Sequence, residues 1–366
     1  MTTGLLPEGF HDRLPPVADA AARLEAQVLG VAASFGYERV DPPIAEFEDS
    51  LRARLKGEGA RDAVRFVDPV SQNTLVIRPD MTAQVGRIAA TRLGHHPRPV
   101  RLSYAGSVLK LRASELDPRR SLRQIGAELI GLDTVAAAQE VVGVAVEALE
   151  AAGVEGVSID FTLPDLLDTL VGGTRSPAQV AALAEALDAK DAGAVAAIDR
   201  AFLPLIEAAG PFDAAIARLR AADGEGRLAS RLDGLEAVAA PLAGRVALTL
   251  DPTERHGFEY QRWLGFSVFA RGLRGEVGRG GTYAVLHDDG QEEAAVGFSL
   301  FADPLLDAGS GAAIRKRLFL PLGTDAAAGA ALRRDGWVTV AALEAGDTPE
   351  AQLCSHLWRD GTVVAL

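Results

Sequence analysis

Residues 101–131 constrain the fold of this chain more than any other stretch, because they predict a strand, an arginine-rich loop and a second strand. The expected strands run from Arg101 to Val108 and from Gln124 to Ile130. Upstream, Thr74 to Ile77 is a further strand candidate, and residues 80–93 have helix-compatible spacing. The chain is therefore expected to build a sheet whose strands are interrupted by helices.

The spacing of hydrophobic residues predicts further helices and strands along the chain. Leu24 and Val28 repeat at a helical interval before Gly36, which stands where a helix would end in a left-handed residue. Residues 135–152 predict another helix, and apolar and polar residues alternate from 157 to 163 as in a half-buried strand. Together these segments predict an α+β fold.

An alanine-rich segment, residues 165–245, predicts a helical insertion within this core. Ser176-Pro177 supplies an N-cap and a first-turn proline for one of its helices. Sheet character returns at residues 246–250 and 266–270, and the glycines between Gly272 and Gly281 predict tight turns.

The last residues predict a separate, small α/β unit. The expected domains are a core of residues 1–310 and a C-terminal unit of residues 311–366, with the boundary between Asp307 and Gly311. The elements expected in the C-terminal unit are a strand at 317–322, a helix at 326–334, a strand at 337–343, a second helix, and a strand at 362–365.

Composition argues against several classes of protein. The 366 residues carry a formal charge of -13 at pH 7, which disfavours nucleic-acid binding as the main activity. Cys354 is the only cysteine, so neither an intramolecular disulfide nor a cysteine-based zinc site is expected. The sequence shows no secretory signal, no apolar run long enough to span a bilayer, and no metal-ligand spacing of its histidines. A cytoplasmic protein is expected.

Seven polar residues have the chemistry needed to hold an α-amino acid: Asp80, Thr82, Gln124, Glu128, Glu259, Tyr260 and Tyr283. An ammonium group needs a carboxylate or carbonyl, and an imidazole is held by one acceptor and one donor. Taken singly, each residue has an ordinary structural alternative, because an Asp at a helix start is usually a cap and a Tyr in a strand is usually core. Their order along the chain favours a functional role.

This order resembles that of histidyl-tRNA synthetases, which are class II aminoacyl-tRNA synthetases. The matching segments are Arg78 to Thr82 (RPDMT) for the acidic amino-acid-binding segment, residues 101–131 for the second class II motif, Gly257 to Tyr260 (GFEY) and Gly280 to Tyr283 (GGTY) for the two histidine signatures, and Ala295 to Leu305 for the third motif. The resemblance covers residues 5–306 and implies an antiparallel sheet with flanking helices. The histidine site that it implies consists of Asp80, Thr82, Lys110, Gln124, Glu128, Glu259, Tyr260, Gly280, Gly281 and Tyr283.

The positions that would bind ATP phosphates depart from this resemblance. Lys110 and Pro304 stand where the synthetase has arginines, and a proline cannot replace a guanidinium group. His256 stands where the synthetase has an arginine before the first histidine signature, and Gln261 replaces the second tyrosine of that signature. Adenylation would therefore lack the cations that stabilise its transition state, and no catalytic residue is expected.

A synthetase-like pocket with these changes resembles the regulatory subunit of ATP phosphoribosyltransferase, a family of histidyl-tRNA synthetase paralogues. The RPDMT string, the segment from Tyr104 to Lys110 and the short C-terminal unit carry this resemblance. It implies a protein that takes L-histidine as an allosteric ligand, needs no cofactor, and assembles with a short catalytic subunit as a homodimer within a hetero-octamer. The helix before Gly36 and the prolines Pro42-Pro43 resemble the class II dimer-interface motif.

Two other interpretations stay open, namely a divergent histidyl-tRNA synthetase or amino-acid ligase, and a free-standing amino-acid-binding protein. Lys110, Pro304 and the acidic composition argue against the first. A positive cluster of Arg112, Arg119, Arg120 and Arg123 either contacts an acidic partner or a phosphate, or is an ordinary solvated face.

Overall fold

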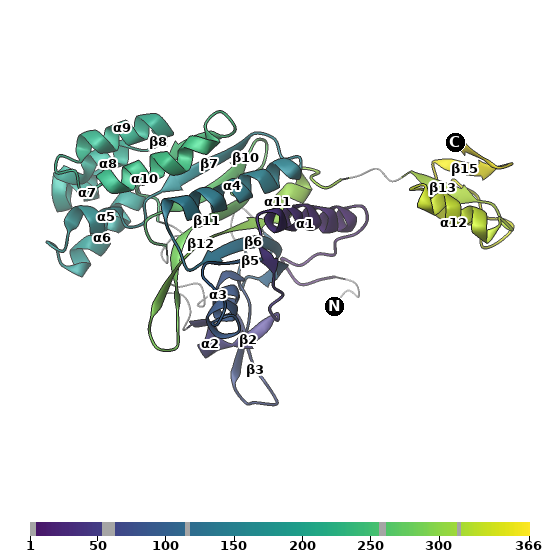
Figure 1. Ribbon diagram of the computed structural model, residues 1–366, viewed down its shortest axis with the longest axis horizontal. Helices are drawn as coiled ribbons and strands as arrows, with labels where there is room; N and C mark the ends of the chain where they lie inside the picture. Colours follow the sequence, from purple (N-terminus) through teal and green to yellow (C-terminus); the bar gives the residue numbers. More distant parts are fainter. Residues whose placement is uncertain (1–4, 53–62, 114–117, 256–260, 313–315) are drawn as a thin grey trace. The chain divides into compact units, whose positions relative to one another are not determined.

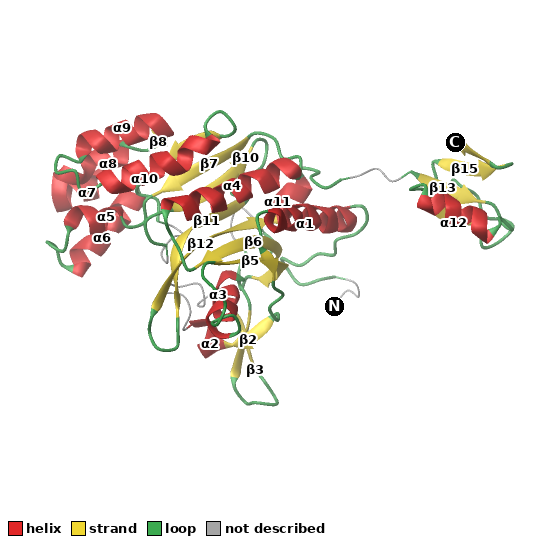
Figure 2. Cartoon of the chain, in the orientation of Figure 1, coloured by secondary structure: helices red, strands yellow, loops and turns green. Residues whose placement is uncertain are grey.

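The computed structural model describes residues 5–52, 63–113, 118–255, 261–312 and 316–366. The chain divides into two compact units, Met1–Gly311 and Ala312–Leu366. Figure 1 follows both units along the sequence, and Figure 2 shows strands and helical structure in each of them. The expected α+β fold is confirmed.

A nine-stranded sheet forms the centre of the first unit. In spatial order its strands are β1 (Glu38–Arg39), β5 (Val100–Leu109), β6 (Ser121–Ile130), β12 (Glu292–Phe301), β11 (Gly278–Leu286), β10 (Gly265–Ala270), β7 (Val157–Thr162), β9 (Ala247–Leu250) and β8 (Gly210–Pro211). The sheet is mixed rather than wholly antiparallel, because β1 pairs with β5 and β7 pairs with β9 in parallel. The helical insertion joins β7 to β9, and a crossover of that length allows two strands to run in the same direction.

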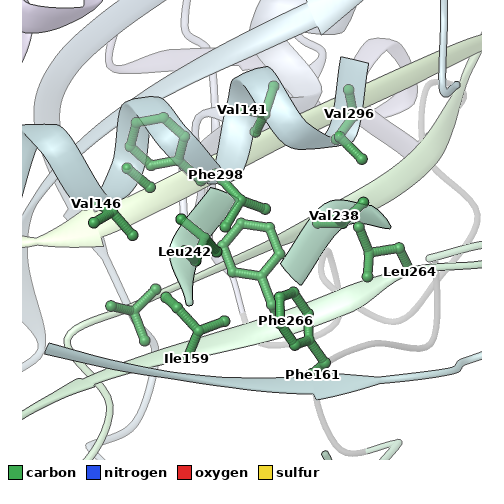
Figure 3. Close-up of a cluster of buried hydrophobic side chains, with 14 of the residues drawn as sticks. Val141, Val146, Ile159, Phe161, Val238, Leu242, Leu264, Phe266, Val296 and Phe298 are labelled. Atoms are coloured by element: carbon green, nitrogen blue, oxygen red, sulfur yellow. The ribbon is translucent and has the colours of Figure 1, made fainter. Parts of the chain in front are cut away.

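One face of the sheet is covered by helices α1 (Val17–Ser34), α4 (Val135–Ala151), α10 (Ala229–Ala239) and α11 (Ala302–Asp307). Their apolar side chains and those of the strands form the main hydrophobic core. Figure 3 shows Val141 and Val146 of α4 in one cluster with Phe266 and Phe298 of the sheet. Gly36 follows α1 with a φ of 85°, as the sequence predicts.

Helix α3 (Thr82–Thr91) covers the other face of the sheet. Side chains alternate between the faces of a strand, so Ile125 of β6 belongs to the main core whereas Ile130 packs with Met81 and Val85 in a second cluster. A three-stranded sheet of β2 (Ala45–Phe47), β4 (Thr74–Ile77) and β3 (Val64–Val67), with the short helix α2 (Glu48–Arg52), adjoins α3.

The alanine-rich insertion is helical, as expected. It contains α5 (Leu166–Val171), α6 (Pro177–Asp188), α7 (Ala192–Asp199), η1 (Arg200–Phe202), α8 (Leu203–Glu207), α9 (Phe212–Ala222), α10 and η2 (Ala240–Leu242). Ser176 caps α6 by accepting a hydrogen bond from the Gln179 backbone N–H, and the Gln179 side chain accepts one from the Ser176 backbone N–H in return. Among the described residues, no helix is long and apolar enough to cross a membrane.

The second unit has a four-stranded sheet and one helix among its described residues. Its strands, in spatial order, are β14 (Val338–Ala341), β13 (Arg317–Leu320), β15 (His356–Arg359) and β16 (Thr362–Ala365), and the helix is α12 (Ala326–Arg334). The second helix predicted here is wrong, because residues 349–353 form turns. Asp347 Oδ2 accepts hydrogen bonds from the backbone N–H groups of Leu343 and Glu344, which closes a turn before a helix could begin.

Packing of α4 against the sheet gives a first prediction. Leu149 has no exposed surface in the main core. Leu149→Ala is expected to lower the free energy of unfolding by about 2–5 kcal/mol, because apolar contacts are lost and a cavity remains. Urea unfolding followed by circular dichroism measures the change, with the exposed Ala151→Ser as a control that should shift it by less than about 0.5 kcal/mol. Equal midpoints for the two variants would contradict this packing.

Candidate functional site

Glu128 of β6 is a buried carboxyl group at the centre of the sheet, with only 1% of its surface exposed. Tyr104 of β5 donates a hydrogen bond to Oε1 (2.9 Å), and Tyr283 of β11 donates one to Oε2 (2.8 Å). The intervening strand β12 places Gly297 opposite Glu128, and a Cβ at Gly297 would lie 1.5 Å from Oε2. Glycine is therefore required there for the carboxyl group to reach Tyr283.

The environment of Glu128 favours its neutral form. Burial raises the pKa of this carboxyl from its ordinary value of 4.5 to about 8, although the hydrogen bonds from Tyr283 and Tyr104 oppose the shift. The neighbouring Asp80 adds to the shift, because a second negative charge disfavours ionisation of the first. These surroundings favour the protonated carboxyl at neutral pH, and a protonated carboxyl can donate a hydrogen bond.

Gln124 lies four residues before Glu128 on β6, so both side chains are on the same face of the sheet. It has no exposed surface, and its amide group forms hydrogen bonds with a second group of polar atoms. Its Oε1 accepts a hydrogen bond from the Met81 backbone N–H (3.0 Å), and its Nε2 donates to Asp80 Oδ2 (2.6 Å) and Ser299 Oγ (2.7 Å). The Thr82 backbone N–H donates to Asp80 Oδ1 (2.7 Å). Both oxygens of Asp80 are thus held beside the start of α3.

A cavity opens over these groups. Of the predicted ligand residues, those that line it are Asp80, Thr82, Glu128, Gly280, Gly281 and Tyr283. Gln124 is held to Asp80 by its hydrogen bond, and Lys110 lies 5.5 Å from the centre of the Phe301 ring, which lines the cavity. Glu259 and Tyr260 lie outside the described residues, so their placement stays a prediction.

The glycines of this cavity lie in a strand. Tight turns are predicted up to Gly281, but Gly278 to Gly281 belong to β11, and only residues near Gly272 and Gly275 form turns. Gly280 pairs with Phe298 of β12, and its absent side chain leaves room for the Phe266 ring, which would lie 2.3 Å from a Cβ. These glycines serve close packing of the strand rather than a change of direction.

Gln261 also lines the cavity, and it has one unsatisfied atom. Its Nε2 donates a hydrogen bond to Gly280 O (2.9 Å), which fixes the orientation of the amide. Its Oε1 is buried and accepts no hydrogen bond from any described residue. A Cβ at Gly281 would lie 2.1 Å from Oε1, and the φ of +154° at Gly281 disfavours a side chain as well.

The positive cluster of the β5–β6 connection is largely engaged within the chain. Arg123 forms an ion pair with Glu25 of α1 and Arg119 forms one with Asp307. Arg120 lies 5.1 Å from the centre of the Phe10 ring, whereas Arg112 is exposed. The cluster is therefore less available to a partner than its sequence indicates.

Sequence reasoning missed Tyr104, Gly297, Ser299 and Gln261 as parts of the site. Tyr104 Oη lies 3.0 Å from Ser299 Oγ, and a Cβ at Gly126 would lie 2.4 Å from Tyr104 Oη. Tyr104 is paired with Gly126 across β5 and β6. The alternation of β5 and β6 could have placed Tyr104 on the face of Glu128, but only the strand register reveals the glycines that make room.

Comparisons with known proteins place the chain in a family. A histidyl-tRNA synthetase family model matches residues 9–305. The ATP phosphoribosyltransferase regulatory subunit of Rhodospirillum centenum is 43% identical over 98% of this chain and 95% of its own length. That of Paramagnetospirillum magneticum is also 43% identical, over 98% of this chain and 97% of its own length. The chain belongs to the ATP phosphoribosyltransferase regulatory subunit family.

Solved structures related to this regulatory-subunit family share its fold. A Bacillus halodurans protein described as an ATP phosphoribosyltransferase regulatory subunit/histidyl-tRNA synthetase superposes with a TM-score of 0.80 at 21% identity, over 96% of each chain. Histidyl-tRNA synthetase from Nostoc sp. PCC 7120 gives a TM-score of 0.78 at 16% identity, over 98% of this chain and 91% of its own. The class II synthetase-like fold expected from the sequence is confirmed.

Proposed function

We propose that this protein is the non-catalytic regulatory subunit of an ATP phosphoribosyltransferase and that its cavity senses L-histidine. It would assemble with a separate short catalytic subunit, which joins ATP to phosphoribosyl pyrophosphate in the first step of histidine biosynthesis. Support comes from relatives of that name at 43% identity over almost the whole chain. The observation that carries the sensing half of the proposal is the buried carboxyl group of Glu128 between two phenols, where burial raises its pKa.

The polar groups of the cavity suit histidine. An imidazole nitrogen can accept the proton of Glu128 or, once protonated, donate to the resulting carboxylate. Asp80, which is held by Gln124 and the Thr82 backbone, offers negative charge to an ammonium group. Tyr283 and the GGTY strand form one wall. In this assignment Glu128 selects the ring, and Asp80 selects the α-amino group.

The surroundings of the cavity support a role without chemistry. Lys110 stands at a synthetase arginine position and faces the Phe301 ring. Pro304 stands at the other, in helix α11, and the adjacent Asp303 is buried in an ion pair with Arg13. A transferring phosphate would meet neither of the two guanidinium groups that adenylation uses. The corresponding assembly is a hetero-octamer of regulatory dimers and catalytic subunits, in which this chain regulates without a cofactor.

The test is phosphoribosyl-ATP formation by the cognate short catalytic subunit, with and without this protein. We expect addition of the protein to raise the rate at least about 10-fold, and histidine to inhibit the mixture by a coupling of about 1–3 kcal/mol. The catalytic subunit alone should be insensitive to the same histidine concentration. No change in rate and no histidine response in the mixture would refute the regulatory role.

The second candidate function is adenylation of histidine with ATP, because the matching family model is that of histidyl-tRNA synthetase. Histidine-dependent exchange of pyrophosphate into ATP by this chain alone would support it. The two assays separate the hypotheses, since a regulatory subunit without adenylation chemistry gives no exchange.

A further inference from the structure

Arg279 of β11 carries the single cationic side chain among the described residues that line the cavity beside Glu128 and Asp80. Side chains alternate along a strand, so Arg279 and Tyr283 share one face of β11. Tyr283 donates from that face to Glu128 (2.8 Å), which places Arg279 on the same side of the sheet as the buried carboxyl. Because 31% of the Arg279 side chain is exposed, a ligand in the cavity can reach it.

An ion pair fixes the orientation of the Arg279 guanidinium. Its Nε donates to Oε1 of Glu276 and its Nη2 donates to Oε2, both at 2.6 Å. A guanidinium has five N–H donors in one plane, so it can hold more than one carboxylate at a time. Arg279 is therefore oriented before a ligand arrives and loses little conformational freedom when it binds one.

Strand order brings this cation close to the anionic group of the cavity. Ser299 of β12 lies directly opposite Arg279 of β11 in the sheet register. On the other side of β12, Gln124 Nε2 donates to Ser299 Oγ (2.7 Å) and to Asp80 Oδ2 (2.6 Å). Arg279 and the Gln124–Asp80 pair therefore flank Ser299. An α-amino acid requires such an arrangement, because its ammonium and its carboxylate are attached to the same carbon atom.

We propose that Arg279 binds the α-carboxylate of the ligand and thereby restricts the cavity to amino acids with a free carboxylate. The inference rests on the function proposed above, in which Glu128 holds the ring and Asp80 holds the ammonium, and it assigns the remaining charged group. Asp80 repels a carboxylate, so that group must lie toward the cation. Lys110, the other cation near the cavity, lies 5.5 Å from the centre of the Phe301 ring and is not among the described lining residues.

Titration calorimetry of the full-length protein at pH 7 with L-histidine and with L-histidinol tests the assignment. Histidinol keeps the imidazole and the ammonium group but has a hydroxymethyl group in place of the carboxylate. We expect the wild-type protein to bind histidine about 10-fold or more tightly than histidinol, because histidinol cannot form the charge-assisted bonds. Binding of neither ligand would contradict histidine sensing and this inference together, whereas equal binding of both would overturn the carboxylate assignment alone.

Variants locate the carboxylate. Arg279→Gln is expected to weaken histidine binding about 10-fold or more and histidinol binding by less than about 3-fold, so retained histidinol binding shows that the cavity is still folded. Arg279→Lys keeps the charge without the planar group and should recover part of the histidine affinity. Arg274→Gln changes an exposed arginine in the loop before β11 and should alter neither affinity. Unchanged histidine affinity in Arg279→Gln, or an equal loss for both ligands, would overturn the assignment.

Discussion

Glu128→Gln is expected to weaken histidine binding by about 10–100-fold and to remove a pH dependence centred near pH 8. The loss follows from replacing a charge-assisted hydrogen bond, worth about 1.5–3 kcal/mol, with a neutral one. In the wild-type protein the free carboxyl is protonated below about pH 8, and a free imidazole is neutral above about pH 6.5. Binding needs one shared proton, so affinity should be constant between these values and fall on either side.

Calorimetry from pH 5.5 to pH 9.5 measures both parts of this prediction. The ammonium group of histidine titrates equally in wild-type and variant experiments, so their difference isolates Glu128. Glu140→Gln is the matched control, because Glu140 also accepts a tyrosine hydrogen bond (from Tyr37, 3.0 Å) but pairs with Arg101 away from the cavity. A Glu128→Gln protein with the wild-type affinity and pH profile would show that Glu128 does not hold the ring.

The same pKa shift predicts a change in stability. The folded protein keeps the Glu128 proton up to about pH 8, whereas the unfolded chain releases it near pH 4.5. Stability due to this group is therefore full below pH 4.5 and is lost as pH rises to 8, by on the order of 4–5 kcal/mol. Glu128→Gln should flatten this slope, so that urea unfolding at pH 6 and pH 9 differs less in the variant than in the wild type.

Gly297→Ala is expected to abolish detectable histidine binding and to lower the free energy of unfolding by about 2–4 kcal/mol. The added Cβ would lie 1.5 Å from Glu128 Oε2, so the carboxyl must leave its position between Tyr104 and Tyr283. Overpacking in a closed core costs about 1–3 kcal/mol, and displaced buried hydrogen bonds add to this. Histidine titration and urea unfolding of the same preparation measure the two effects.

Gly143→Ala controls for the loss of a glycine. Gly143 lies inside α4, and a Cβ there meets nothing within 4 Å. Alanine should therefore stabilise the helix by up to about 1 kcal/mol and leave ligand binding unchanged. If Gly297→Ala behaved like Gly143→Ala, the close approach of β12 to Glu128 would be contradicted.

Local patterns in the sequence predicted much of the fold. Strand β4 and helix α12 have the predicted bounds, and α6 begins at its predicted cap. These elements depend on nearby residues, such as a cap or an alternation of apolar side chains. The helix expected before the last strand is wrong, because residues 349–353 form turns after a turn closed by the Asp347 side chain, and apolar spacing does not reveal such hydrogen bonds.

The polar residues of the candidate site could be predicted from the sequence, but the glycines that make room for them could not. Glu128 and Gln124 were identified by resemblance, and alternation places both on one face of β6. The role of Gly297 depends on its pairing with Glu128 across two strands that are more than 160 residues apart in sequence. The engagement of Arg123 by Glu25 likewise depends on how α1 packs, which sequence spacing does not encode.

Strand β6 connects the cavity to the helices on the opposite side of the sheet without any intervening loop. Gln124 is bonded to Asp80 in the cavity, and the neighbouring Arg123 is bonded to Glu25 of α1 through its side chain and to Asp303 of α11 through its backbone N–H. One peptide bond thus joins the polar network of the candidate site to Arg123, which contacts both helices. We therefore expect a shift of Gln124 along the strand to move Arg123 as well, and with it the contacts to α1 and α11.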